Sequence, residues 1–167
     1  MWRSIGASEA SGDVCLFLDT ATNIQAEELQ PFAMACYKGV DIALQRSRNR
    51  IMAGAQNMET IMLARTFLNN LLSRDELGTS SMCDLPFAIT RQAAAQIGFQ
   101  HLLVPPLAHA MAIDRGLRIE RSHRIKGATS REKGRPEGKR TWRELTCLGD
   151  HMEAIHYITE RNNHLIP

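Results

Sequence analysis

The sequence predicts an all-α protein, and three observations support this fold class. Aromatic residues make up only 5% of the 167 residues. Met occurs eight times, mostly in stretches with helix-like spacing. Met, Ala, Leu and Gln favour packed helices, whereas strands favour β-branched and aromatic residues. The third observation is a heptad spacing of apolar residues between Tyr37 and Leu72, which predicts a long amphipathic helix packed with a second helix in a hairpin or bundle.

Residues 1–24 are expected to form a flexible N-terminal segment. The first thirteen residues are rich in Ser, Gly and Ala, a composition that favours disorder. The apolar run Val14–Leu18 fits either a strand or the start of a helix, because five residues are too few to distinguish the two periods.

A helical domain is predicted over residues 25–113, and its strongest signal is one long helix from Ala26 to about Arg74. Apolar residues recur there at spacings of three and four, and only Arg65 clearly disagrees with the pattern. Such a stripe either packs into a bundle core or, as in a coiled coil, associates with a partner. The predicted association seam consists of Tyr37, Val40, Leu44, Ile51, Met58, Ile61, Leu68 and Leu72.

The second helix is expected after a loop over residues 73–84. Asp84 is a candidate cap, with Pro86 in the first turn. Pro105 and Pro106 then end or kink this helix, because proline lacks the backbone N–H that a helix interior needs. A short helical piece follows over Leu107–Ile113.

Residues 114–140 form a basic segment that we expect to be a flexible linker. It holds ten Lys or Arg and four acidic residues, a net charge of 10 − 4 = +6, against +2 for the whole chain. Its Gly and Pro residues argue against a continuous helix. The segment is either a solvated linker or a site for nucleic-acid phosphates, although it lacks aromatic residues that stack on bases. Its basic residues are Arg115, Arg118, Arg121, Arg124, Lys126, Arg131, Lys133, Arg135, Lys139 and Arg140.

A C-terminal helix is predicted over residues 141–167. Thr141 is a candidate cap, and Glu144 follows at the spacing of a capping box. Apolar residues from Trp142 to Ile158 give this helix one apolar stripe.

No motif in the chain indicates catalysis, so we expect no catalytic residue, no metal site and no cofactor. The sequence contains neither a GxSxG elbow nor a phosphate-binding loop. His151 and His156 are five residues apart, unlike the four-residue spacing of a zinc-binding helix. No two cysteines lie within four residues of each other, so neither a metal knuckle nor a redox pair is expected. The four cysteines, read as reduced thiols, are Cys15, Cys36, Cys83 and Cys147.

The location predicted from the sequence is the cytoplasm. No run of about 18 apolar residues, the length that a membrane span needs, is present. The first twelve residues lack the apolar core of a secretory signal. Widely spaced cysteines fit a reducing compartment better than a disulfide framework.

Two stretches carry a family resemblance. The first is LQPFAMACYKGVDIALQRSRNRIMAGAQNMETIMLARTFLNNLL, and the second, after a short break, is DLPFAITRQAAAQIGFQHLL. Together, over about residues 29–109, they resemble the phasin family, bacterial proteins that coat polyhydroxyalkanoate storage granules. The resemblance implies binding to an apolar granule surface through an exposed helix face and self-association into small oligomers. The prolines at 105 and 106, the basic segment and the C-terminal helix depart from the family pattern.

The function expected from the sequence is that of a non-catalytic, phasin-like helical coat or scaffold protein. Its partner is expected to be a granule surface or a partner helix, with formation of a homo-oligomer. One alternative is a nucleic-acid-associated protein that uses residues 114–140, and another is a helical adaptor for a second protein.

Overall fold

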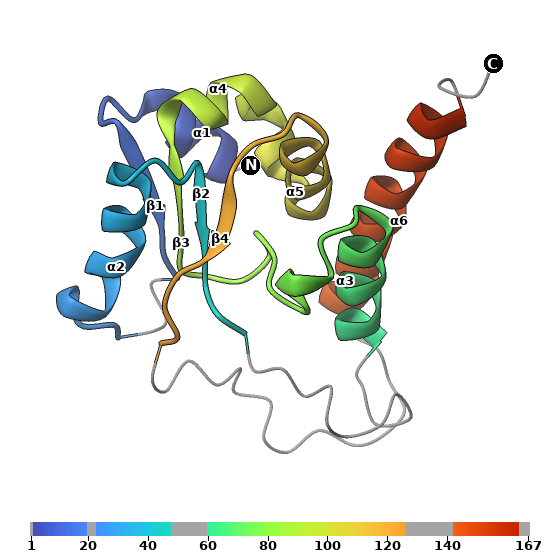
Figure 1. The fold of residues 1–167 in the computed structure, drawn as a ribbon, viewed down its shortest axis with the longest axis horizontal. Coiled ribbons are helices and arrows are strands. Elements are labelled where there is room, and N and C mark those ends of the chain that lie inside the picture. The colour runs from blue at the N-terminus through green and yellow to red at the C-terminus, as the bar shows by residue number, and fades with distance from the viewer. Residues whose placement is uncertain (1, 20–22, 48–59, 126–141, 164–167) are drawn as a thin grey trace.

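The protein has an α/β fold, so the expectation of an all-α protein with a coiled-coil helix is wrong. The computed structural model describes residues 2–19, 23–47, 60–125 and 142–163, and in them six α-helices surround a four-stranded mixed sheet (Figure 1). The helices are α1 (Trp2–Glu9), α2 (Ala26–Tyr37), α3 (Thr60–Leu71), α4 (Arg91–Ile97), α5 (Pro105–Asp114) and α6 (Trp142–Asn163), with 3-10 turns η3 (Asp75–Leu77) and η4 (Phe99–Leu103).

The sheet has the strand order β1-β3-β2-β4, in which β3 is antiparallel to both of its neighbours. The edge strand β4 is parallel to β2, so the chain between them crosses over through α3, α4 and α5. The strands are β1 (Val14–Phe17), β2 (Ile42–Leu44), β3 (Phe87–Thr90) and β4 (Ile119–Arg121).

Both faces of the sheet are covered, which explains why the strands lack a polar and apolar alternation. Ala43 and Ala88 lie opposite each other in the register and pack with Phe32 of α2 on one face. Their small side chains allow α2 to lie close to the sheet. On the other face, residues such as Ile42 and Phe87 belong to the main core.

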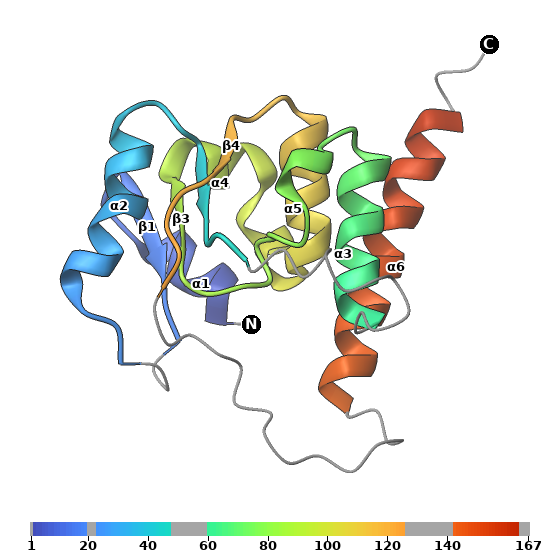
Figure 2. The same ribbon diagram turned by 60° about the horizontal axis from the view of Figure 1, so that its bottom comes forward.

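The helices on that second face form two successive layers (Figures 1 and 2). α1, α4 and α5 are nearest the sheet, and α3 and α6 lie beyond α5. Every residue from Pro106 to Ala112 of α5 is buried, because α5 is enclosed between the sheet and α6. This burial is the reason that α5 has no polar stripe.

The predicted single helix from Ala26 to Arg74 is divided among several elements. α2 ends at Tyr37, and the backbone turns at Gly39, whose φ of 92° favours glycine. The chain then forms β2, and α3 does not begin until Thr60. The heptad pattern therefore combined apolar residues that serve separate elements.

The predicted second helix is also wrong, because its first turn is the strand β3. Thr90 ends that strand and caps α4, its Oγ1 accepting a hydrogen bond from the Ala93 amide at 3.1 Å. Pro105 occupies the start of α5, where the missing N–H has no cost.

Three further predicted segments have different outcomes. Residues 2–9, expected to be flexible, form α1, whose Ala7 is fully buried. The basic segment contributes strand β4, while residues 126–140 lie outside the described part of the chain. The predicted C-terminal helix is present as α6. Within the described ranges, no helix combines the length and apolar character needed to cross a bilayer.

Candidate functional site

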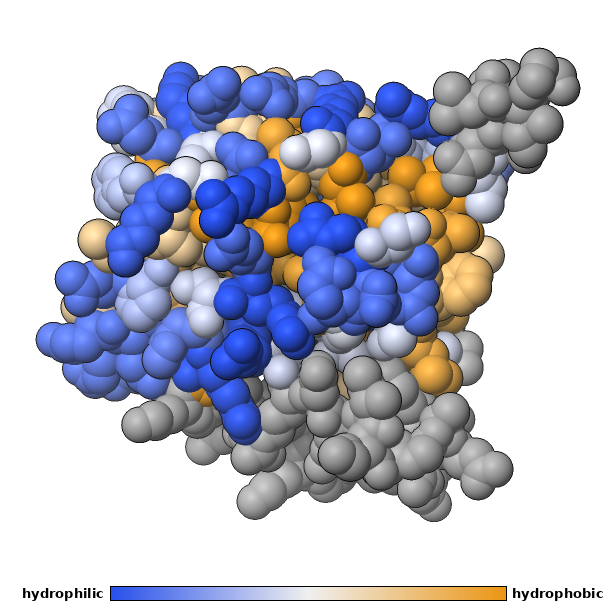
Figure 3. Space-filling model, in the orientation of Figure 1, coloured by the Kyte–Doolittle hydropathy of each residue, from blue (hydrophilic) through white to orange (hydrophobic). Residues whose placement is uncertain are grey.

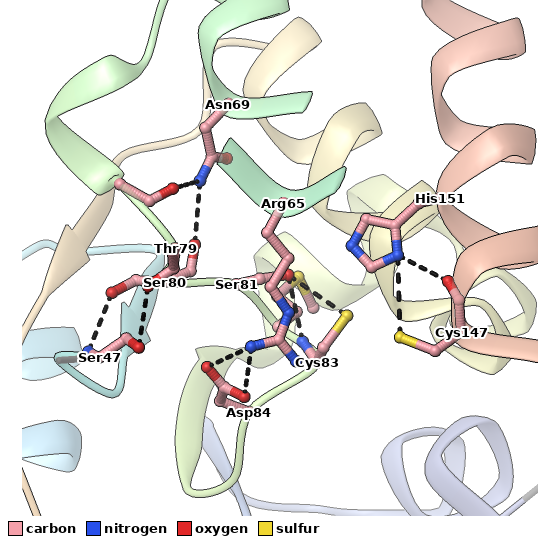
Figure 4. A network of polar contacts seen from close by, with 12 residues as sticks. Ser47, Arg65, Asn69, Thr79, Ser80, Ser81, Cys83, Asp84, Cys147 and His151 are labelled. Atoms are coloured by element: carbon pink, nitrogen blue, oxygen red, sulfur yellow. Dashed lines mark hydrogen bonds and ion pairs between the residues drawn. The ribbon is translucent and has the colours of Figure 1, made fainter. Parts of the chain in front are cut away.

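Two cysteines that are distant in the sequence meet beneath α3 and α6. The loop before β3 contributes Cys83, and the first turns of α6 contribute Cys147 (Figure 4). Polar side chains from α3, α5 and the loop surround the two sulfurs. We refer to this group as the thiol cluster, and its members are Arg65, Asn69, Ser81, Cys83, Asp84, His109, Cys147 and His151.

Cys83 is held by the loop itself. The Cys83 amide donates a hydrogen bond to Ser81 Oγ at 3.3 Å, and this hydroxyl donates to Cys83 Sγ at 3.4 Å. The side chains of Cys147 and His151 also lie close to Cys83, and both lower the pKa of its thiol. Cys83 is half-buried, so its sulfur keeps limited access to solvent.

The two thiols have opposite acidities. The hydrogen bond from Cys147 lowers the pKa of Cys83 well below its usual value; burial opposes this change, and His151, Arg65 and Ser81 reinforce it. The same hydrogen bond raises the pKa of Cys147, and burial raises it further. Cys83 is therefore the more acidic thiol of the pair, and Cys147 is the less acidic one.

Arg65 supplies the positive charge beside Cys83. Its Nη1 lies 2.8 Å from Asp84 Oδ1 and 3.0 Å from Oδ2. Burial lowers the pKa of Arg65, but Asp84 and Cys83 raise it more, so the guanidinium stays charged. Arg65 Nε is buried and has no hydrogen-bond partner among the described residues, which makes it a donor that a reacting molecule can use.

The tautomer of His151 follows from its contact with the α6 backbone. Nδ1 lies 2.6 Å from the Cys147 carbonyl oxygen, which can only accept, so Nδ1 carries a proton. In the neutral ring Nε2 is then the base, and it is buried with no partner in the described part of the chain. Nε2 lies on the side of the ring that faces Arg65 and Cys83 (Figure 4).

A second buried histidine helps to fix the loop. Asn69 Nδ2 donates to the carbonyl oxygens of Gly78 and Ser80 at 2.8 and 3.2 Å, so Asn69 Oδ1 accepts from His109 Nε2 at 2.8 Å. Burial lowers the pKa of His109 to about 4, and the ring is neutral at pH 7.

Two more contacts hold the loop that carries Cys83 in place. Arg3 of α1 donates from Nη1 to the Met82 carbonyl oxygen at 2.9 Å, and its guanidinium lies 5.7 Å from the centre of the Phe87 ring. At the other end of the loop, Thr79 Oγ1 donates to Ser47 Oγ at 2.9 Å. The thiol cluster is thus built on a loop anchored to α1, α3 and the end of β2.

The arrangement suits thiol chemistry better than metal binding. Among the described residues, no group of three or more His, Cys, Asp or Glu side chains is placed to hold a metal ion. The thiol cluster instead combines an acidic thiol, a second thiol near it, a charged N–H donor and a histidine base.

Sequence reasoning missed this cluster, although one signal for it was present. Cys147 and His151 are four residues apart, which places them on the same face of a helix. No sequence pattern indicated that Cys83 would meet them, because that contact depends on the packing of α6.

The residues of the predicted association seam have unequal positions. Tyr37 is exposed at the end of α2, Ile61 and Leu72 are half-buried, and Ile51 and Met58 lie outside the described residues. The remaining three are buried in the core, namely Val40, Leu44 and Leu68.

The predicted basic residues are only partly placed. Arg115 donates to the Gln96 carbonyl oxygen. Arg118 directly precedes β4, and Arg121 is its last residue. Arg124 is exposed just before the described range ends. The other six, all beyond residue 125, lie outside the described residues.

Comparisons of the chain with protein-family models, with curated proteins and with solved structures gave no match, and the thiol cluster itself is therefore the basis for a functional assignment.

Proposed function

We propose that this protein is a thiol-based redox protein in which Cys83 reacts with a hydroperoxide and Cys147 then forms a disulfide with it. The observation that carries the proposal is that the side chains of Cys83 and Cys147 lie near each other, within a cluster that supplies a base and a positive charge. This role differs from the non-catalytic role expected from the sequence.

In the first step, the Cys83 thiolate attacks one oxygen of the hydroperoxide. A sulfur–oxygen bond forms and the oxygen–oxygen bond breaks, giving Cys83 sulfenic acid and an alkoxide or hydroxide ion. The sulfur loses two electrons, and the peroxide gains them. Arg65 Nε is a free donor for the negative charge that develops on the leaving oxygen, and a His151 ring protonated by the Cys83 proton can neutralise it.

A hydroperoxide fits the access to Cys83 better than a protein substrate does. Cys83 is a half-buried residue, and Ser81, Arg65 and Cys147 lie around its sulfur. A small oxidant can reach a sulfur in such a position, whereas the disulfide of a folded partner protein cannot approach it closely.

In the second step, Cys147 attacks the sulfur of the Cys83 sulfenic acid. A sulfur–sulfur bond forms, and the hydroxyl leaves as water after taking the proton of the Cys147 thiol. Two thiols have then lost two electrons in total, and an external dithiol can restore them by disulfide exchange. Sulfenic acids with a neighbouring thiol usually react in this way, and Cys147 is close enough to Cys83 for each to affect the pKa of the other.

The proposal can be tested by oxidising the reduced protein with hydrogen peroxide and mapping its disulfides by mass spectrometry. The wild type is expected to form a bond between Cys83 and Cys147. In Cys147→Ser the sulfenic acid should persist on Cys83 and react with dimedone. In Cys83→Ser neither product should appear.

Cys36 provides a matched control, because it is a buried cysteine far from the thiol cluster. Cys36→Ser should leave the disulfide and its rate of formation unchanged. The proposal is wrong if the oxidised wild type carries no Cys83–Cys147 bond, or if dimedone labels Cys36 as readily as Cys83 in the Cys147→Ser variant.

The roles expected from the sequence have less support. The coat or scaffold role depended on a continuous amphipathic helix, and α2, β2 and α3 replace that helix. Self-association, the adaptor role and a role with nucleic acid stay predictions.

A further inference from the structure

We infer that a hollow beside the edge strand β4 binds the phosphate group of a small molecule. The hollow has a volume of about 430 Å³ and is lined by four arginines and two glutamates. In the view of Figure 3, strongly hydrophilic residues cover the face that carries β4, next to an apolar area over the helices. The six charged residues are Arg46, Arg74, Glu76, Arg118, Glu120 and Arg121.

Three separate parts of the fold bring the arginines together. Arg46 follows β2, Arg74 precedes η3, and Arg118 and Arg121 lie at the two ends of β4. The Arg46 amide donates to the His123 carbonyl oxygen at 2.9 Å, which fixes its backbone beside the chain that leaves β4. The convergence is therefore a property of the tertiary structure rather than of one basic run.

The two glutamates neutralise only two of the four arginines. Arg74 Nε lies 2.5 Å from Glu76 Oε1, and Arg118 Nη2 lies 2.8 Å from Glu120 Oε1. Arg46 and Arg121 form no ion pair with any other described residue. The lining thus keeps a charge of +2, since four positive charges face two negative ones.

Glu76 stays ionised at neutral pH. Burial raises the pKa of Glu76, but its hydrogen bonds and the charges of Arg74 and Arg121 lower it more, so the pKa lies below the usual value. Arg74 is held in place on a second side, because its Nη2 donates to the Ile119 carbonyl oxygen at 2.8 Å. An anion therefore meets at least one arginine, Arg74, whose side chain is already positioned.

The surroundings favour a compact, doubly charged anion. A phosphate monoester carries a charge of about −1.5 to −2 at pH 7, which matches the residual +2, and arginine binds its oxygens in a bidentate manner. The buried side chains of Leu77 and Ile119 line the hollow and keep water from one side of the charges. None of the described residues that line it is aromatic, so these residues offer no platform on which a nucleic-acid base can stack.

The inference can be tested by isothermal titration calorimetry on the full chain with two probes, inorganic phosphate and glycerol phosphate. Both should bind with similar affinity if the phosphate group alone is recognised, and glycerol phosphate should bind more tightly if the site recognises an ester. Acetate, with a single charge, should bind at least about tenfold more weakly than either, because it loses one charge-assisted contact.

Arg46→Ala and Arg121→Ala should each weaken phosphate binding by about tenfold, the effect of losing one charge-assisted hydrogen bond. Arg124→Ala is the matched control, since Arg124 is exposed in the same segment but does not line the hollow, and its effect should stay under about twofold. Circular dichroism of each single variant checks that it is folded.

Three results would overturn the inference. They are binding of neither probe, equal weakening in Arg124→Ala and Arg121→Ala, or tight binding of a single-stranded oligonucleotide with no binding of either small phosphate. The last result would support the nucleic-acid alternative instead.

Discussion

The thiol cluster and the arginine-lined hollow beside β4, called the arginine hollow below, each contain an arginine–carboxylate pair at 2.8 Å. The two pairs differ in burial. The side chains of Arg65 and Asp84 are 14% and 26% exposed, whereas those of Arg118 and Glu120 are 60% and 48% exposed. A partly buried pair cannot separate without leaving a charge in an apolar region, so it fixes the geometry of a site. An exposed pair exchanges its partners for water or for an incoming anion at little cost. The same chemistry therefore supports a rigid site in one place and a binding site in the other.

The largest expected effect is the loss of Arg65. Arg65→Met should lower the free energy of unfolding by about 2–4 kcal/mol, below the full cost of a completely buried pair because both side chains keep some exposure. Asp84 would be left without its partner in a place where burial already raises its pKa. Urea denaturation at pH 7 measures the loss, and adding Asp84→Asn should recover part of it. No recovery in the double variant would mean that the packing of Arg65 matters more than its charge.

The next effect is a dependence of stability on pH that comes from His109. Burial lowers its pKa to about 4, whereas an unfolded chain has a histidine pKa of about 6.5. Because the folded-state pKa is depressed, the unfolded state binds the proton first as the pH falls through 6.5. Stability should therefore decrease by about 2 kcal/mol between pH 7 and pH 5 and continue to decrease toward pH 4.

His109→Gln should remove most of this dependence, although it will lower stability at pH 7 by disturbing the bond to Asn69. His156→Gln is the control, because His156 is exposed on α6. Denaturation curves at several pH values give the free energy of unfolding of each variant as a function of pH. If this free energy changes equally with pH in both variants, His109 is not the responsible group.

A smaller effect concerns the reactivity of Cys83. Cys147→Ala removes the hydrogen bond that does most to lower the pKa of Cys83. At pH 6.5 the rate of alkylation of Cys83 by iodoacetamide should fall, because a smaller fraction of Cys83 is then thiolate. Peptide mass spectrometry follows the rate, and Cys15→Ala should not change it. A faster reaction in Cys147→Ala would mean that Cys147 mainly shields the sulfur.

The smallest effect is expected in the arginine hollow. Arg118→Ala should change the free energy of unfolding by less than about 1 kcal/mol, because its ion pair with Glu120 is exposed. Urea denaturation under the conditions used for Arg65→Met makes the two values comparable. A loss as large as that of Arg65→Met would remove the distinction between the two sites.

The sequence predicted the last helix well, but it predicted neither the sheet nor the division of the long helix into α2, β2 and α3. The last helix could be recognised because a cap and a long apolar stripe occur together, and α6 is 22 residues long. β2 and β4 are only three residues long, and β2 is buried at every position, so neither shows the alternation that identifies a strand. The run Val14–Leu18 fitted either a strand or the start of a helix, and its first four residues form the strand β1.

The thiol cluster could be predicted only in part. The spacing of Cys147 and His151 places them on one helix face, and Ser81 lies two residues before Cys83. The meeting of these two groups depends on how α6 packs on α3 and α5, and that packing is determined by apolar residues with no special spacing. The arginine hollow could not be predicted from the sequence either, because Arg46 and Arg74 lie outside the basic segment.

The position of α6 in the chain also has a consequence during protein synthesis. Of the described elements, α6 leaves the ribosome last, and it carries both Cys147 and His151. Domains fold as the chain emerges from its N-terminal side. A nascent chain that has exposed Cys83 but not yet α6 therefore lacks two of the side chains that lower the pKa of Cys83. Under the proposed function, the newly made protein would become sensitive to oxidants only when α6 docks.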